Sequence, residues 1–502
     1  MRVLLVHPSA LMYSEIFLRL EPIGLERVGA ALLRHGHDVR IIDLQTDQAK
    51  SYPDALRRFR PECVMFGLNY LANVPEVITL AKQAKAVLPG CLVVAGGHSV
   101  SFIARHLLDT CQEAIDAVAR GEGETVAPRI LATDRDSLHE VPGVVTRAGT
   151  GPPPTMLPTL DEPLPARHLL PHRSRYFIGE LDPCASVEFT RGCPWDCSFC
   201  SAWTFYGRSY RRMSPDVAGH ELATIQEPNV FLVDDVAFIK PDHGMAIADQ
   251  IERRRIRKRY YLETRADVLL RHPEVFQRWH RLGLTYMFLG MEALDAEGLD
   301  LFHKRISPDE NIKALEIARR IGITVAVNLI ADPGWDTEQF RLVREWALSV
   351  PEIVHLTVIT PYPGTEIWHT QAQQLTSLDY RLFDIQHAVT PTRLPLDEFY
   401  RELVATQAVL NRKHLGVRAL AGTARIVAGH LAHGQTNFVR MLWKFPRVYN
   451  AERLHAEHSR PVTFRLPEPS RGPGRPHRRE LYVHQHQNVH QHDGSSTHSH
   501  SA

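Results

Sequence analysis

The chain has 502 residues, of which 44% are hydrophobic, and carries 58 basic against 57 acidic side chains. That length is sufficient for two or three domains with their own cores. The net charge of +1 excludes nucleic-acid binding driven by bulk charge. Seven scattered cysteines do not form a disulfide framework and suit the reducing cytoplasm. No apolar run reaches the roughly 18 residues of a membrane span, so any membrane contact is predicted to be peripheral.

Residues 1–150 alternate between strand-like and helical patterns. Apolar runs typical of buried strands occupy 2–6, 38–44, 62–67 and 91–95, with helical patterns at 25–35 and 75–88. This alternation predicts a doubly wound α/β domain, whose ligands bind at the carboxyl ends of the strands. The pair Gly96-Gly97 follows one such end and lets a ligand approach the backbone. A proline-rich stretch, 151–182, then predicts a linker.

Three closely spaced cysteines follow the linker. Cys193, Cys197 and Cys200 have the spacing Cys-x3-Cys-x2-Cys. Three thiolates can hold three irons of a four-iron, four-sulfur cluster and leave the fourth iron open to a small molecule. The alternative, a structural zinc site, needs four ligands, and no second cysteine pair with ligand spacing exists. The other cysteines stand singly, at positions 63, 91, 111 and 184.

Six strand-like runs with helical spacers predict an open (βα)6 barrel over residues 183–395. The runs are 185–190, 230–233, 260–263, 286–289, 323–330 and 353–360. Function lies at the carboxyl ends of barrel strands. Polar residues stand in or at the ends of these runs, namely Asp234, Asp235, Glu263, Arg265, Glu292 and Asn328. By residue type alone, helix caps, surface salt bridges or core hydrogen bonds account for them equally well.

Residues 396–460 predict a helical C-terminal extension with a one-sided charge. No acidic residue lies between Glu402 and Glu452, whereas seven basic residues do: Arg412, Lys413, Arg418, Arg425, Arg440, Lys444 and Arg447. Apolar residues are interleaved with them, a pattern that suits the surface of an anionic bilayer. A helix pair that caps the barrel is an equally good interpretation. The remainder, 461–502, is rich in proline, arginine and histidine and predicts a disordered tail.

The cysteine motif follows a strand-like run and has an aromatic residue before its last cysteine, and it resembles that of the radical S-adenosylmethionine (SAM) superfamily. The resemblance implies a 4Fe-4S cluster that splits SAM, with SAM contacts from Phe199, Asp234, Asp235, Glu263, Arg265, Glu292 and Asn328. Residues 1–150 resemble the cobalamin-binding domain that precedes many such cores. This implies cobalamin contacts from Asn69, Leu71, Gly96, Gly97, His98, Gly121 and Glu122. The Asp-x-His-x-x-Gly motif of other cobalamin proteins is absent, so no histidine is expected as the lower ligand of cobalt.

Three local strings, 7–15, 201–208 and 384–388, resemble the bacterial hopanoid C-3 methylase family, and the likeness runs from residue 1 to about 460. It implies a radical SAM methyltransferase that uses methylcobalamin to methylate an unactivated carbon, C-3 of ring A of a triterpenoid lipid. A one-electron reductant such as flavodoxin or ferredoxin is expected, as is peripheral contact with the inner membrane. Two alternatives stay open: a cobalamin-dependent radical enzyme acting on a tetrapyrrole, phosphonate or peptide, and a cobalamin-binding sensor.

Overall fold

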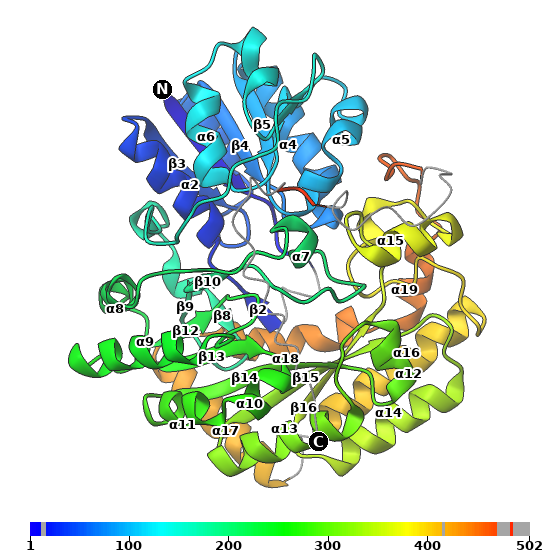
Figure 1. Ribbon diagram of the computed structural model, residues 1–502. Coiled ribbons are helices and arrows are strands. Elements are labelled where there is room, and N and C mark those ends of the chain that lie inside the picture. The colour runs from blue at the N-terminus through cyan, green and yellow to red at the C-terminus, as the bar shows by residue number, and fades with distance from the viewer. Residues whose placement is uncertain (12–16, 414–416, 469–481, 485–502) are drawn as a thin grey trace, which may run out of the picture.

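Two sheets of six strands each organise the chain, the first parallel except for its last strand and the second parallel throughout (Figure 1). The computed structural model describes residues 1–11, 17–413, 417–468 and 482–484. The first sheet and its helices, blue to cyan in Figure 1, lie above the second, which is green to yellow. Helix α7 (Ala202–Phe205) and strand β10 (Thr190–Arg191) lie between the two units.

The N-terminal sheet has the order β3-β1-β4-β5-β6-β7, and only β7 runs antiparallel to its neighbour. Its strands are β1 (Arg2–His7), β3 (Asp38–Asp43), β4 (Cys63–Gly67), β5 (Leu92–Gly96), β6 (Ala117–Ala119) and β7 (Val144–Thr146). Alternate residues of β1 enter different cores, with Leu4 and Val6 on one face and Val3 and Leu5 on the other. Both faces are covered by helices, as the sequence predicts for a doubly wound domain.

The helices of this unit are α2 (Ile23–Arg34), α3 (Ser51–Arg58), α4 (Val74–Val87), α5 (Ala104–Thr110) and α6 (Gly123–Leu131). Short 3-10 turns follow the two central strands, η1 (Leu71–Asn73) after β4 and η2 (Ser99–Phe102) after β5. Because parallel strands end at the same edge, these turns lie together on the edge that faces the second unit.

The predicted linker, 151–182, is packed between the two units. Arg167 is 7% exposed and pairs with Glu21 of the first unit and Glu221 of the second, each at 2.6 Å. Strand β8 (Phe177–Ile178) pairs with β2 (Leu18–Arg19). The two units are therefore joined by buried charge as well as by the chain.

The second sheet has the order β16-β15-β14-β13-β12-β9, and all its pairs are parallel. Its strands are β9 (Cys184–Val187), β12 (Asn229–Leu232), β13 (Arg259–Thr264), β14 (Leu284–Glu292), β15 (Thr324–Ala331) and β16 (Ile353–Val358). The order confirms the open six-stranded barrel, since β9 and β16 are edges and do not pair with each other. Other parts of the chain lie along these edges, namely segment 17–20, β8, Asn437 and Tyr449. Asn437 Nδ2 donates a hydrogen bond to Asp182 Oδ1 at 3.2 Å.

The outer layer consists of α8 (Pro215–Thr224), α9 (Pro241–Arg253), α10 (Ala266–Arg271), α11 (Pro273–Arg281), α12 (Ala296–Leu301), α13 (Pro308–Ile321), α14 (Thr337–Ser349) and α15 (Glu366–Gln371). The C-terminal helices are α16 (Leu396–Arg412), α17 (Val417–Ala432), α18 (Asn437–Val448) and α19 (Ala451–Glu457). Gln407 of α16 donates to the Leu356 carbonyl of β16 at 2.6 Å. Helix α16 thus covers the last strand, although the sequence places it in the extension.

The prediction of a disordered tail is wrong for its described parts. Leu466 is 1% exposed in the N-terminal core, and Val483 is 3% exposed, with its amide donating to the Thr204 carbonyl at 3.0 Å. Val462, Phe464 and Leu466 alternate with polar residues, a strand-like pattern that the proline- and arginine-rich composition of the tail obscured. The rest of the tail, 469–481 and 485–502, lies outside the described residues.

Candidate active site between the two domains

The loop that carries the three cysteines is closed by a two-stranded ribbon. Strand β10 pairs with β11 (Arg211–Arg212) in antiparallel register, so residues 192–210 form one loop. Gly192 begins it at φ +98°, and a Cβ there would lie 2.2 Å from the Ser209 carbonyl oxygen, so only glycine fits. The Gly192 amide donates to Asp235 Oδ2 at 2.7 Å, which ties the loop to the end of β12.

The three cysteines lie close enough together for their charges to interact. Burial, followed by Asp235, raises the pKa of Cys193 to about 12, and burial with the other two thiols raises that of Cys200 further. Iron must therefore displace protons when it binds. Among the described residues, no three cysteine, histidine or carboxylate side chains converge as a single metal ion requires. A cubane cluster does not need such convergence, because each thiolate binds a different iron, and the set fits this group better than zinc.

Asp234 fixes the backbone of the loop. Its Oδ1 accepts from the Phe189 amide at 2.8 Å and its Oδ2 from the Thr190 hydroxyl at 2.6 Å. Burial raises its pKa to about 7. Both oxygens are engaged by the protein, so Asp234 positions the ribbon, whereas its neighbour Asp235 is exposed.

Three carboxylates from adjacent strand ends face one another. Burial raises the pKa of Asp235 to about 6 and that of Glu263 to about 7, and Asp235 and Glu292 add to the shift of Glu263. Glu292 lies in a β-bulge of β14 with φ +69°, which turns it inward, and its Oε1 occupies the space beside Gly290 that a Cβ would fill. The ends of β12, β13 and β14 thus form one acidic ring.

One cation and one amide contact Glu292 of this ring, and the sequence offered a signal only for the amide. Lys304 Nζ lies 3.2 Å from Glu292 Oε1, and the lysine is 4% exposed. Asn328 Nδ2 donates to Glu292 Oε2 at 3.4 Å and to Thr357 Oγ1 at 3.2 Å. Asn328 stands in a predicted strand, but Lys304 follows helix α12 with no motif around it.

Phe199 and Arg265 have different neighbours around the cysteine loop. Phe199 packs edge-to-face on Phe302 with ring centroids 5.4 Å apart and stays half-buried. Arg265 is 6% exposed and donates to Cys197 Sγ at 3.5 Å. The structure therefore places Arg265 against a cysteine thiol, whereas Phe199 has an accessible face for a ligand.

The two turns after β4 and β5 are bound to each other. The His98 amide donates to Asn69 Oδ1 at 3.2 Å, and the Ser99 hydroxyl donates to the Asn69 carbonyl at 2.5 Å. Gly97 has φ +127°, and a Cβ there would lie 2.7 Å from the Leu68 carbonyl oxygen. Gly96 is half-buried beside it, whereas Leu71 is 1% exposed inside the N-terminal core. Asn69 and Gly96-Gly97 therefore form one ledge at the strand ends, with Leu71 supporting it from below.

His98 joins this ledge to the cysteine loop. Its Nε2 lies 2.8 Å from the hydroxyl of Ser201, the residue after Cys200, and its ring stacks on Phe205 with centroids 4.5 Å apart. Burial lowers its pKa to about 4, so the ring is neutral at physiological pH. The contact brings the ends of the first sheet directly to the mouth of the barrel.

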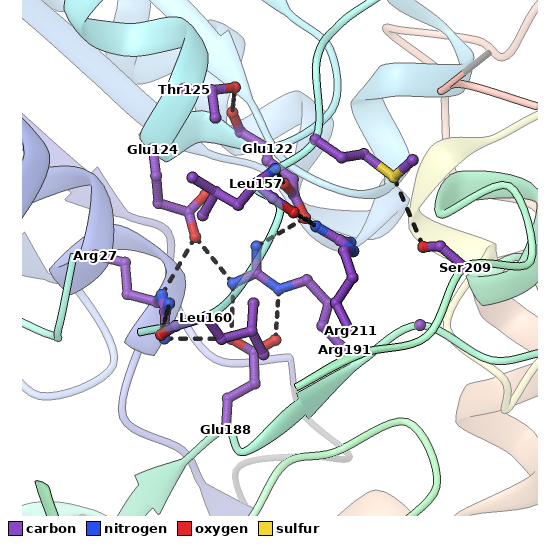
Figure 2. A network of polar contacts seen from close by, with 12 residues as sticks. Arg27, Glu122, Glu124, Thr125, Leu157, Leu160, Glu188, Arg191, Ser209 and Arg211 are labelled. Carbon is purple, nitrogen blue, oxygen red and sulfur yellow. Dashed lines mark hydrogen bonds and ion pairs between the residues drawn. The ribbon is translucent and has the colours of Figure 1, made fainter. Parts of the chain in front are cut away.

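Gly121 and Glu122 do not join the ledge. Gly121 is packed against Pro154 and His484, which lie within 2.9 Å of where its Cβ would stand. Glu122 Oε1 pairs with Arg191 at 2.9 Å and Arg211 at 2.6 Å, as Figure 2 shows, and its Oε2 accepts from the Leu157 amide. Its carboxylate therefore binds the two arginines of the ribbon that closes the cysteine loop and does not face the ledge.

Accessible side chains of the two units face each other, and the space between them is called the chamber here. Tyr70 is 51% exposed, yet burial and the charge of Glu263 raise its pKa. Asp235 is exposed, and His98 and Glu263 half-exposed, although burial shifts the pKa of each. A side chain that is accessible and desolvated at once faces a space that protein surrounds. Tyr70 and His98 come from the N-terminal unit, and the carboxylates come from the barrel.

Comparison with known proteins matches both units. The model of the Radical SAM superfamily matches residues 187–347, and that of the B12 binding domain matches residues 11–131. A protein described as hopanoid C-3 methylase, from Methylococcus capsulatus, is 59% identical over 93% of this chain and 92% of its own length.

Two solved structures share the fold. The radical SAM methyltransferase TsrM from Kitasatospora setae, with cobalamin and a 4Fe-4S cluster, superposes with a TM-score of 0.59 at 18% identity over 75% of this chain and 79% of its own. The cobalamin-dependent radical SAM enzyme OxsB, with aqua-cobalamin and SAM bound, gives 0.58 at 16% identity over 68% of this chain and 52% of its own.

The chain is a radical SAM enzyme with an N-terminal B12-binding domain, and its cofactors are a 4Fe-4S cluster, SAM and cobalamin. Within that class it belongs to the family of the hopanoid C-3 methylase of Methylococcus capsulatus. Both matched ranges fall within the two units described above. The cysteine loop lies in the range matched by the Radical SAM model, and Gly96-Gly97 lies in the range matched by the B12-binding model.

Proposed function

We propose that this enzyme transfers a methyl group to C-3 of ring A of a hopanoid lipid. The observation that carries the proposal is the shared chamber: the ledge at Gly96-Gly97, the cysteine loop and the acidic ring all open onto it. Cobalamin supplies a methyl group and the cluster with SAM supplies a radical, so both can reach one carbon that lacks a nucleophilic electron pair. The name of the relative from Methylococcus capsulatus supports the choice of hopanoid.

We assign the residues as follows. The cluster is held by Cys193, Cys197 and Cys200. SAM is bound by Phe199 and by the acidic ring with its partner Asn328, with Asp235 and Glu263 as the accessible carboxylates. Cobalamin lies on the ledge of Asn69, Gly96 and Gly97. Asp234, Arg265, Leu71 and Glu122 hold these elements in place, because the protein itself occupies their polar or apolar atoms.

The inside of the barrel suits an apolar polycycle. Phe231 and Tyr261, with ring centroids 4.9 Å apart, are buried at 4% and 8% exposed, and Tyr286 and Phe288 of β14 pack against them on the inside of the barrel. The outward residues of the same strand, Met287 and Leu289, are fully buried, whereas its inward aromatics stay half-exposed. Burial of apolar surface contributes about 25 cal/mol per Å². A rigid hydrocarbon is therefore held below the acidic ring with one end in the chamber.

The C-terminal helices supply the membrane contact in this proposal. Arg425, Arg440 and Trp443 are exposed, with Trp443 at 63%, and Leu431 of α17 is 52% exposed. The side chains of Arg418 and Arg447 lie outside the described ones. Lys413 instead donates to the Ala347 and Val350 carbonyls, so part of the basic segment caps the barrel. No helix in the described part of the chain is long and apolar enough to cross a bilayer, and the contact proposed is peripheral, on the cytoplasmic face of the inner membrane.

Lipid profiling of a deletion strain tests the proposal. Loss of the gene removes C-3-methylated hopanoids and leaves the unmethylated hopanoids in place, and the wild-type gene restores them. The variant Cys197→Ala serves as the matched control, because it keeps both domains and removes one cluster ligand. An unchanged hopanoid profile, with a change among tetrapyrroles or peptides, would assign the same chemistry to another substrate.

A further inference from the structure

Arg265 lies against Cys197, the second of the three cysteines of the loop. It precedes α10, directly after β13, and is 6% exposed. Its Nη1 donates to Cys197 Sγ at 3.5 Å, its Nη2 to the Lys304 carbonyl at 2.7 Å and its Nε to Asp267 Oδ1 at 2.9 Å. All three nitrogens thus have partners in the protein.

An aromatic ring from the cysteine loop covers the guanidinium. The Arg265 Cζ lies 4.5 Å from the centroid of Trp195, which stands between Cys193 and Cys197. A cation over an indole face is attracted by the ring and loses contact with water. The same loop therefore supplies both the thiol that accepts the hydrogen bond and the ring that holds the donor.

The positive charge is only partly balanced where it meets the thiol. Asp267 pairs with the far side of the guanidinium, at Nε, and also with Arg271 at 2.7 Å. Lys304 is itself paired with Glu292. Among the described residues, Nη1, the nitrogen that faces Cys197, has no carboxylate partner. A cation in a water-poor site acts over this distance with little screening.

We propose that Arg265 is a redox-tuning residue, which positions the Cys197 thiolate and raises the reduction potential of the cluster. The potential of an iron–sulfur cluster depends on its net charge and on hydrogen bonds to its sulfurs. Reduction transfers one electron from an external low-potential donor of the flavodoxin or ferredoxin class and adds one negative charge, with no bond made or broken. A cation and an N–H donor at a ligand sulfur stabilise that added charge, so they favour the reduced state. The inference rests on cluster ligation by the three cysteines.

The test is a redox titration of the reconstituted holoenzyme, followed by the EPR signal of the reduced cluster. Arg265→Gln removes the charge and should lower the midpoint potential by the equivalent of about tenfold in the reduction equilibrium constant, or ~59 mV for a one-electron couple. Arg265→Lys keeps the charge but not the planar fork and should give a smaller fall. Arg271→Gln is the matched control, since Arg271 shares Asp267, is 57% exposed in its side chain and has no contact with Cys197.

Iron and sulfide content, measured on the same samples, reports separately on ligation. A full cluster with an unchanged midpoint in Arg265→Gln overturns the proposal, as does an equal fall in Arg271→Gln. If Arg265→Gln loses its cluster, the midpoint potential is measured in Arg265→Lys and in Trp195→Leu instead. Wild-type midpoint potentials in both variants refute the redox role of Arg265. A loss of SAM binding with an unchanged midpoint would show that the guanidinium serves SAM. If Cys197→Ala fails to assemble the cluster and the Arg265 variants have wild-type midpoint potentials, the assignment of Cys197 as a cluster ligand stands and only the redox role of Arg265 is rejected.

Discussion

Removing Arg27 should loosen the two domains from each other. Arg27, Arg191 and Arg211 meet Glu122, Glu124 and Glu188 in a network of equal positive and negative charge (Figure 2). None of the six side chains is more than 12% exposed. Arg27→Met leaves one uncompensated buried carboxylate, which costs about 3–5 kcal/mol. With a urea slope of about 2–3 kcal/mol/M, the midpoint should fall by about 1–2 M.

Urea transitions of the holoenzyme at pH 7, with tryptic cleavage inside 151–182 as the probe of domain opening, measure this shift. The double variant Arg27→Met/Glu124→Gln restores neutrality and should recover part of the loss, with a coupling of about 0.5–3 kcal/mol. Burial alone raises the pKa of Glu124, but Arg191 and Arg27 hold it below its ordinary value. The ionised Glu124 stabilises the fold above its unfolded pKa of about 4.3, and this stabilisation is lost as the pH falls through the pKa of the folded state. The fall in urea midpoint caused by Arg27→Met should therefore become smaller in acid. A wild-type midpoint, or a double variant no better than the single one, would refute the network.

Three further predictions concern other parts of the molecule. Cys193→Ala, Cys197→Ala or Cys200→Ala should abolish 5′-deoxyadenosine formation, whereas Cys91→Ala should retain it, and a triad variant at the wild-type rate would contradict the ligand assignment. Burial lowers the pKa of His387, but Asp384 and Glu457 raise it to about 9, so its stabilisation is full below about pH 6.5 and lost as pH rises through 9. His387→Gln should reduce the change of the urea midpoint with pH between about 6.5 and 9. If the midpoint changes with pH as it does in the wild type, His387 is not the group that titrates. Arg425→Glu with Arg440→Glu should weaken sedimentation with anionic liposomes at low salt, since each basic residue near the surface adds about 1 kcal/mol to binding. Lys313→Glu with Arg320→Glu on α13 makes the same change in charge and should not weaken it. Equal effects of both pairs would reject a membrane surface on α17 and α18.

The strands were predictable because each is a short apolar run between turn residues. All six barrel strands fall within a few residues of their predicted positions, although β14 has nine residues and extends to Glu292 through a bulge that no pattern indicated. The two-residue strands β2 and β8 carry no periodic signal. Arg27 and Arg167 are buried against the usual preference of arginine for solvent, and only partners distant in sequence explain them.

The site was predictable where chemistry depends on local spacing. The three cysteines lie within eight residues of one another and Gly96 and Gly97 are adjacent, so a short stretch of sequence was enough to single out each group. The roles of single polar residues were not predictable, because the sequence does not distinguish a strand-end carboxylate that is buried, such as Asp234, from one that stays exposed, such as Asp235, although both accept hydrogen bonds from backbone amides. His98 illustrates the same limit, since its partner Ser201 lies in the other domain.

The central claim is that one chamber delivers a methyl group to an unactivated hopanoid carbon. Anaerobically reconstituted enzyme, given cobalamin, a low-potential reductant, SAM with a trideuteromethyl group and diplopterol in liposomes, tests it by mass spectrometry of the extracted lipid. We expect a hopanoid with the intact trideuteromethyl group at C-3, together with 5′-deoxyadenosine, and neither product from Cys197→Ala. Formation of 5′-deoxyadenosine with no labelled hopanoid, under conditions in which diplopterol is bound, would contradict it.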